Sequence, residues 1–162
     1  MSDDAPSPAD DAPDRTDDAP DSTRGILDTS TVILLARLVD ADALPAEPLI
    51  TAVTLAELSV GPLVTEDQEE RAARQAHLQQ AEADFDPLPF DADAARAFGR
   101  VAASLRRAGR KPAARTYDAM IAATAVANDL PVFTCNPADF EGIDDLRVIV
   151  VPVPEDPDPD AA

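Results

Sequence analysis

Several residue types are scarce in this chain of 162 residues, and each scarcity narrows the chemistry available to it. Its one cysteine, Cys135, cannot form an intramolecular disulfide or supply a CxxC metal or redox pair. Its one histidine, His77, lies among polar neighbours, so a Ser-His-Asp or Cys-His site would have to recruit a residue from a solvated helix. No Gly-rich phosphate-binding loop occurs among its five glycines. Carboxylates are therefore the only abundant reactive groups.

Long apolar runs are also absent from the sequence. No run approaches the roughly 20 residues that span a membrane. The first ten residues lack the positively charged and apolar regions of a signal peptide. We therefore expect a cytoplasmic protein with no membrane partner.

Acidic residues outnumber basic ones by 32 to 13, which gives a formal net charge of -19. Residues 1–24 and 152–162 combine acids and prolines with almost no large apolar side chains, so we predict two disordered tails. The stretch between them, residues 25–151, is long enough to fold as one domain with its own core. The negative net charge opposes non-specific binding of nucleic acid. An RNA ligand would therefore need a local group of basic residues.

Short apolar runs alternate with helical patterns along the domain. Strands are predicted at residues 25–28, 49–51, 132–134 and 148–151, the last two being of the fully buried parallel type. Helices are predicted after residue 28, after caps at Thr54 and Thr116, over residues 66–84 as a largely exposed helix or partner face, and from residue 91. This alternation predicts an α/β fold, a three-layer domain with a mostly parallel central sheet flanked by helices.

Three acids follow the predicted strands. Asp28 ends the first strand, Glu57 lies one turn into the helix after the second, and Asp118 lies in the first turn of an Ala-rich helix. Taken singly, Asp28 could be a helix cap and Asp118 an acid favoured by the helix dipole, whereas Glu57 is a lone acid in an apolar segment. Ligands of open parallel sheets bind at the carboxyl ends of the strands, where these acids would converge.

Converging carboxylates need a counter-charge. Two unit charges 4 Å apart repel by about 4 kcal/mol at an effective dielectric of about 20. Either protons or a divalent cation must neutralise such a cluster. An all-oxygen set of ligands suits Mg²⁺ or Mn²⁺ better than Zn²⁺.

A basic segment leads into Asp118. No acid occurs between Asp93 and Asp118, and the seven basic residues there form what we call the arginine belt: Arg96, Arg100, Arg106, Arg107, Arg110, Lys111 and Arg115. One interpretation is a solvated helix face paired with acids elsewhere. Because the belt ends beside Asp118, we favour an RNA path to the acids along Arg96, Arg100, Arg107 and Arg110.

Four motifs occur in order at residues 25–30 (GILDTS), 54–61 (TLAELSVG), 117–125 (YDAMIAATA) and 134–142 (TCNPADFEG). In this order and spacing they resemble the PIN-domain family and, more narrowly, the VapC-type toxins of bacterial and archaeal type II toxin-antitoxin systems. The resemblance covers residues 25–151 and excludes both predicted tails.

The resemblance implies a Mg²⁺- or Mn²⁺-dependent endoribonuclease whose catalytic and metal-binding acids are Asp28, Glu57 and Asp118. The ion would polarise the scissile phosphate and lower the pKa of a bound water for in-line attack. The resemblance also implies a cognate antitoxin and a homodimer. The family often has a fourth acid where this chain has Asn136, so whether Asn136 or Asp139 completes the site is open.

Two alternatives to a toxin keep the same fold. The first is an RNA-processing nuclease that has no antitoxin. The second is a catalytically silent module that binds RNA or a partner protein, and the uncharged Asn136 is the best argument for it.

Overall fold

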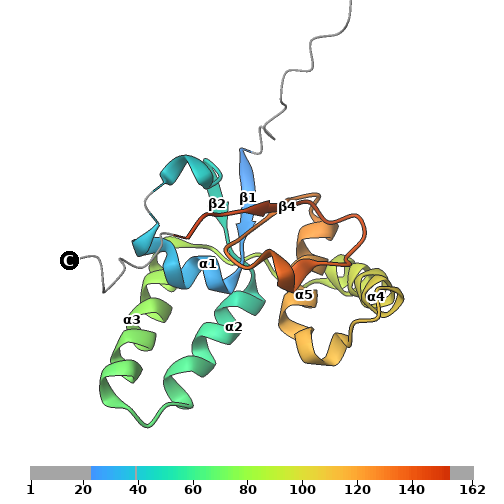
Figure 1. Cartoon of the computed structure of the whole chain (residues 1–162). Coiled ribbons are helices and arrows are strands. Elements are labelled where there is room, and N and C mark those ends of the chain that lie inside the picture. Colours follow the sequence, from blue (N-terminus) through green and yellow to red (C-terminus); the bar gives the residue numbers. More distant parts are fainter. Residues whose placement is uncertain (1–22, 39, 154–162) are drawn as a thin grey trace, which may run out of the picture.

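The computed structural model describes residues 23–38 and 40–153 (Figure 1). The tails predicted at 1–24 and 152–162 lie outside the described residues except at their junctions with the domain. At the first junction, Arg24 already belongs to a strand, so the folded part begins one residue earlier than predicted. In the described part of the chain, no helix combines the length and the apolar character needed to cross a membrane.

The predicted α/β fold with a parallel sheet is confirmed. The strands are β1 (Arg24–Leu27), β2 (Glu47–Leu49), β3 (Val132–Thr134) and β4 (Val148–Val150). All neighbouring pairs run parallel, in the order β2-β1-β3-β4. Strands β1 and β3 therefore occupy the centre of the sheet, although more than 100 residues separate them along the chain.

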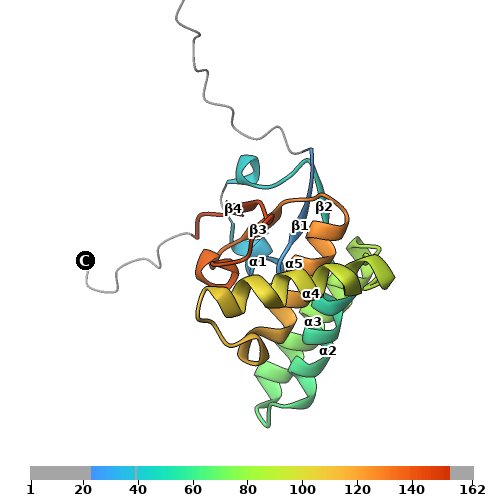
Figure 2. The same cartoon turned by 90° about the vertical axis from the view of Figure 1, so that its right-hand side faces the viewer.

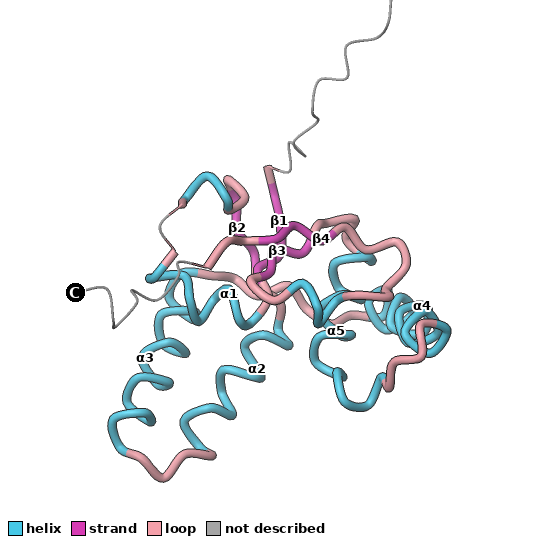
Figure 3. Tube along the Cα trace, viewed as in Figure 1, coloured by secondary structure: helices cyan, strands magenta, loops and turns pink. Residues whose placement is uncertain are grey.

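Helices cover both faces of this sheet. They are α1 (Thr29–Leu34), α2 (Ala52–Val60), α3 (Gln68–Asp84), α4 (Ala92–Arg107) and α5 (Thr116–Ala127). Short 3-10 helices η1 (Leu35–Arg37), η2 (Ala41–Ala43), η3 (Gly61–Leu63), η4 (Pro112–Arg115) and η5 (Pro137–Phe140) lie between the larger elements. Helices α2 and α3 lie side by side and project from the sheet, while α4 and α5 lie together on its other side (Figures 1 and 3).

The alternation of side chains along β1 divides the core into two layers. Ile26 faces the cluster that contains Val101 of α4 and Ile121 of α5. Leu27 faces the opposite cluster, which contains Val32 of α1 and Ala81 of α3. Figure 2 shows α4 and α5 in front of the sheet, in keeping with three layers.

Two predicted helix caps are wrong. Helix α2 is capped by Thr51, whose hydroxyl accepts a hydrogen bond from the Thr54 backbone N–H at 3.1 Å, so Thr54 lies inside the helix. The strand predicted at 49–51 lies two residues earlier, at Glu47–Leu49, and Thr51 forms only an isolated bridge with Leu88. Thr116, predicted as a cap, is the first residue of α5 and follows directly from η4.

Two other predictions fail at the ends of elements. Strand β4 is not fully buried, because it is an edge strand, and its Val150 side chain is 56% exposed. Helix α4 ends at Arg107, so Arg110 lies in the following turn and does not extend the basic face of that helix. The exposed helix predicted at 66–84 is confirmed as α3.

Candidate active site

Asp28 is held at the carboxyl end of β1 by its neighbours. The register of β1 and β3 places it beside Thr134, whose hydroxyl donates to Asp28 Oδ2 at 2.7 Å. The Thr31 backbone N–H donates to Oδ1 at 2.9 Å, and the Ser30 hydroxyl lies within 3.0 Å of both carboxylate oxygens. Asp28 is thus the cap of α1, which is the simple role that the sequence allows for it. It is also a buried carboxylate, 3% exposed, with a fixed orientation.

Glu57 reaches the same region from α2. Its carboxylate accepts a hydrogen bond from the Thr29 hydroxyl, so this lone acid of an apolar segment does have a partner. Burial raises the pKa of Glu57, the Thr29 hydrogen bond opposes that shift, and the charge of Asp28 adds to it. The electrostatic effect of Asp28 indicates that these two carboxylates share one site.

Asp118 occupies the first turn of α5 and is half-buried. Burial and the negative charges of Asp139, Glu57 and Asp28 raise its pKa to about 6, while Arg115 opposes the shift. The structure therefore brings together the three acids predicted from the sequence. It adds Asp139 as a fourth charge, whose effect on Asp118 is larger than that of Glu57 or Asp28.

Asp139 is positioned by two side chains. Asn136 donates from Nδ2 to Asp139 Oδ2 at 2.6 Å, and Arg115 forms an ion pair with Oδ1 at 2.6 Å. Helix η5 creates this contact, since residues three apart lie side by side in a 3-10 turn. Asn136 therefore supports Asp139 in this structure, and the spacing of these two residues was the available sequence signal.

The acidic cluster consists of Asp28, Glu57, Asp118 and Asp139. Across the described ranges, no three His, Cys, Asp or Glu side chains are arranged so that together they could hold a metal ion. The four carboxylates act on one another through their charges, and all their donor atoms are oxygens. This donor chemistry is the kind that Mg²⁺ and Mn²⁺ prefer.

Much of the arginine belt is paired with acids. The pairs are Arg96 with Asp93 (2.7 Å), Arg107 with Asp144 (2.5 Å), Arg110 with Glu141, and Arg115 with Asp139 (2.6 Å). Within the described part of the chain, Arg100, Arg106 and Lys111 form no ion pair. The belt therefore offers less uncompensated charge than its sequence suggests. Exposed pairs are weak enough to exchange partners, so an RNA path there stays a prediction.

His77 is less exposed than its polar sequence neighbours predict. It is half-buried and lines a pocket of about 550 Å³ that also contains Glu57. Its spacing to Leu78, Ala81 and Phe85, which pack in the core layer under α1, is the helical period that could have placed it on the inward side. The pocket is lined by Thr29, Ile33, Glu57, Leu58, Gly61, Glu70, Ala73, Arg74 and His77.

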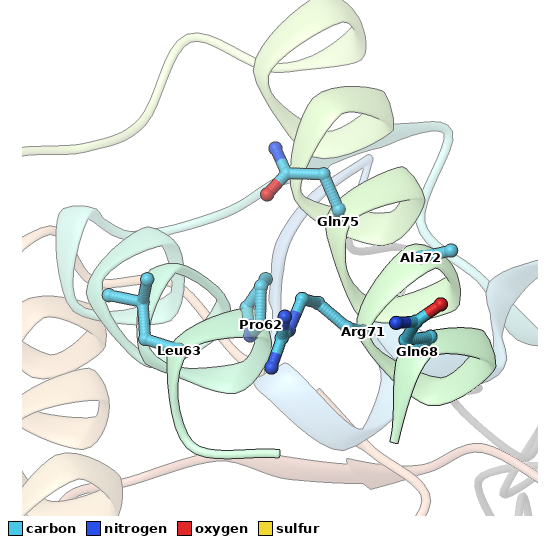
Figure 4. A pocket seen from close by; sticks show the side chains of 6 residues that line it. All are labelled: Pro62, Leu63, Gln68, Arg71, Ala72 and Gln75. Carbon is cyan, nitrogen blue, oxygen red and sulfur yellow. The ribbon is translucent and has the colours of Figure 1, made fainter. Parts of the chain in front are cut away.

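Another pocket, of about 510 Å³, lies at the far end of the α2–α3 pair (Figure 4). It is lined by Pro62, Leu63, Gln68, Arg71, Ala72 and Gln75. None of the four acids of the acidic cluster lines this pocket, so it offers no group for the chemistry considered above.

Comparison with known proteins identifies relatives over most of the chain. The PIN domain family matches residues 26–146. Ribonuclease VapC5 of Mycobacterium tuberculosis is 41% identical over 122 residues, which cover 74% of this chain and 87% of that protein. The crystal structure of VapBC-5, a toxin-antitoxin system of M. tuberculosis, contains a chain with a TM-score of 0.69 and 40% identity, covering 80% of this chain and 99% of that one. DNA-bound VapBC from Salmonella typhimurium gives a TM-score of 0.64 and 26% identity, with coverage of 80% and 98%.

Proposed function

This chain belongs to the PIN-domain family, and from that premise we propose that it is a VapC-type endoribonuclease dependent on Mg²⁺ or Mn²⁺. It hydrolyses RNA phosphodiester bonds at the acidic cluster. Asp28, Glu57 and Asp118 are the proposed catalytic and metal-binding residues. The similarity to Ribonuclease VapC5 supports the activity, and the acidic cluster supports the assignment of residues.

The observation that carries this proposal is that the carboxylates of Asp139, Glu57 and Asp28 all lie close enough to Asp118 to act on its charge. Burial is the largest cause of the raised pKa of Asp118, these three charges add to it, and Arg115 opposes the shift. A cluster of this kind lacks a counter-charge, and a hard divalent cation would supply one. The residues present therefore fit Mg²⁺ or Mn²⁺ by charge and by donor type, while among the described residues no three acids are arranged to hold the ion together.

Each residue has a distinct proposed part in the reaction. A divalent ion, when bound, stabilises the charge that develops on the phosphate and makes a water molecule more acidic. Asp28 gives the site a fixed carboxylate, because three neighbouring groups donate to it. Thr29 orients Glu57, and Asn136 with Arg115 orients Asp139. Asp139 is a positioning residue here, since it acts on Asp118 through its charge.

We also propose a cognate antitoxin as the partner that controls this activity. The similar proteins of known structure are described as VapBC toxin-antitoxin complexes, which supports a partner of that kind. The homodimer is proposed from the family resemblance, and the cytoplasmic location stays a prediction from the sequence.

The central test is Asp28→Asn, which keeps the shape of the side chain and removes its charge. We expect loss of RNA cleavage in Mg²⁺ or Mn²⁺ and a protein that still folds, because Asn is as good a helix cap as Asp. Cleavage is measured on a labelled RNA with protein shown free of contaminating ribonuclease, and folding by thermal unfolding.

Asp86→Asn is the matched control, because Asp86 is an exposed acid that belongs neither to the acidic cluster nor to an ion pair of the arginine belt. It should cleave RNA like the unmodified protein. Cleavage retained by Asp28→Asn, or cleavage that persists in EDTA, would contradict the proposal.

Two further measurements separate the alternatives. Calorimetric titration with Mn²⁺ should show binding that Asp28→Asn weakens, whereas no binding to the unmodified protein would favour a silent binding module. A short reading frame beside the gene, whose product co-purifies with this chain, is expected for a toxin. Its absence would favour an RNA-processing nuclease.

A further inference from the structure

The pocket beside Glu57 opens between three helices and adjoins the acidic cluster. Thr29 and Ile33 come from α1, Glu57 and Leu58 from α2, and the remaining wall mostly from α3. Its volume of about 550 Å³ lies within the usual range of small-ligand sites, about 300–1,000 Å³. Its exposed lining is mainly apolar, with Ile33, Leu58 and Ala73 among the walls. A planar group that enters it would therefore meet apolar surfaces.

The polar groups of this pocket differ in whether they already form hydrogen bonds or ion pairs within the protein. Arg74 donates to the Gly61 carbonyl at 2.9 Å and forms an ion pair with Glu70. Thr29 donates to Glu57. His77 makes no hydrogen bond or ion pair with any described residue, although it is half-buried. Its imidazole carries one donor and one acceptor when neutral, so it is the uncommitted hydrogen-bonding group of the wall.

The charges of the pocket select among the parts of an RNA. Glu57 and Glu70 both line it, but Glu70 and Arg74 form an ion pair and offset each other, so the carboxylate of Glu57 is the charge that would repel a phosphate group. A nucleobase is uncharged and planar, with two apolar faces and a polar edge. Proteins that recognise single-stranded RNA bind such bases against flat or apolar side chains and contact their edges by hydrogen bonds. The pocket therefore suits a base better than the sugar-phosphate backbone.

We propose that this pocket binds a nucleobase of the RNA substrate next to the scissile phosphate, and that His77 determines which base is preferred. The inference rests on the proposed nuclease function, because it places the phosphate at the acidic cluster and the neighbouring base beyond Glu57. His77 is thereby a specificity residue that contacts the substrate away from the reacting atoms.

The test uses short RNAs that carry each of the four bases in turn at the two positions flanking a mapped cleavage site. His77→Ala should lower kcat/KM for the preferred base about tenfold, the effect of one hydrogen bond worth about 1.4 kcal/mol, mainly by raising KM. The disfavoured bases should change little, so the preference should largely disappear. His77→Asn, which keeps a donor and an acceptor, should restore part of it.

Two more variants make the result specific to the pocket. Gln79→Ala, an exposed substitution on the same helix outside the pocket, should leave the base preference unchanged. Ala73→Phe fills the pocket from the same wall without removing a hydrogen bond, and it should raise KM for every RNA.

The outcomes distinguish this inference from the function on which it rests. An unchanged base preference in His77→Ala together with an unchanged KM in Ala73→Phe, while Asp28→Asn is inactive, overturns the inference and leaves the nuclease assignment standing. The same holds if both pocket variants weaken only the binding of a co-expressed partner protein. Cleavage retained by Asp28→Asn overturns the nuclease assignment and the inference with it.

Discussion

Asp28 and Asp118 belong to one acidic cluster, but they differ in the hydrogen-bond donors that surround their carboxylates. Asp28 accepts hydrogen bonds from two hydroxyls and one backbone N–H. Asp118 has no hydrogen-bond partner among the described residues, and burial, together with the charges of three carboxylates, disfavours its ionised form and raises its pKa. The carboxylate of Asp28 is thus fixed in orientation, whereas the ionised form of Asp118 is destabilised. A cation would stabilise that form, so the cluster as a whole attracts one.

The raised pKa of Asp118 predicts a pH-dependent stability for the metal-free protein. Between about 3.8 and about 6, the folded state holds a proton that the unfolded state has lost, so the free energy of unfolding falls as the pH rises through this range. Asp118→Asn removes the charge, and we expect it to be more stable than the unmodified protein at pH 8 by about 1 kcal/mol, a figure reduced for solvent screening.

This difference is measured by urea unfolding in EDTA at pH 4 and pH 8. The advantage of Asp118→Asn should shrink at pH 4, where protons already neutralise Asp118. A smaller pH dependence should persist in the variant because Glu57 has a pKa raised in the same direction. A stability gap equal at both pH values would show that Asp118 carries no unfavourable charge.

The site residues differ in how far the sequence could predict them. Asp28 follows a strand and Asp118 begins a helix, and in a parallel sheet such positions converge whatever the details of packing, while Glu57 lies farther along the helix after β2. Asp139 was left open because its contact with Asn136 depends on the 3-10 turn η5. His77 was missed because its neighbours in sequence are polar, although its helical period places it against the core layer.

At the level of elements, local patterns predicted which segments form strands and helices better than where they end. Thr51 and Thr54 can both cap a helix, and in the structure the cap is Thr51, which also forms a bridge with Leu88. The β-branched run at 148–151 indicates a strand, but no local feature gives its place at the edge of the sheet. Boundaries and strand order depend on tertiary contacts that a single sequence pattern does not contain.

The packing of β1 against Phe133 gives a prediction about an element. A Cβ added at Gly25 would overlap the ring of Phe133, so Gly25→Ala should destabilise the fold by about 1–3 kcal/mol through overpacking. Gly99 is the matched control, because it lies in the exposed side of α4 with no atom within 4 Å of an added Cβ.

Gly99→Ala should stabilise the protein by about 0.5–1 kcal/mol, since alanine loses less backbone entropy than glycine in a helix. Urea unfolding of both variants at one pH measures the two effects. Equal changes in stability, or a neutral Gly25→Ala, would show that the centre of the sheet has room beside Phe133.

On the scale of the whole molecule, charge is distributed unevenly. The domain carries the arginine belt, partly paired with acids, while residues 1–22 contain eight Asp and a single Arg. We predict that this acidic segment competes with RNA for the belt. The segment can be removed only up to residue 22, because the Thr23 carbonyl accepts a hydrogen bond from the Glu47 backbone N–H at 2.7 Å and Arg24 belongs to β1.

Removal of residues 1–22 should tighten RNA binding at low salt, measured in the Asp28→Asn background to prevent cleavage. The gain should vanish near 1 M salt, where the Debye length is about 3 Å. A full-length chain with the eight Asp changed to Asn separates the effect of the segment's charge from the effect of its length. This variant should bind RNA as tightly as the truncated chain does. Equal affinity of all three proteins at low salt would contradict the competition.

The hydrogen bond from Thr134 to Asp28 joins residues 106 positions apart. During synthesis, Asp28 leaves the ribosome long before the strand that completes its surroundings. A nascent chain cannot assemble the acidic cluster until β3 has emerged and inserted next to β1. The order of translation thus places completion of the acidic cluster after most of the protein has been made.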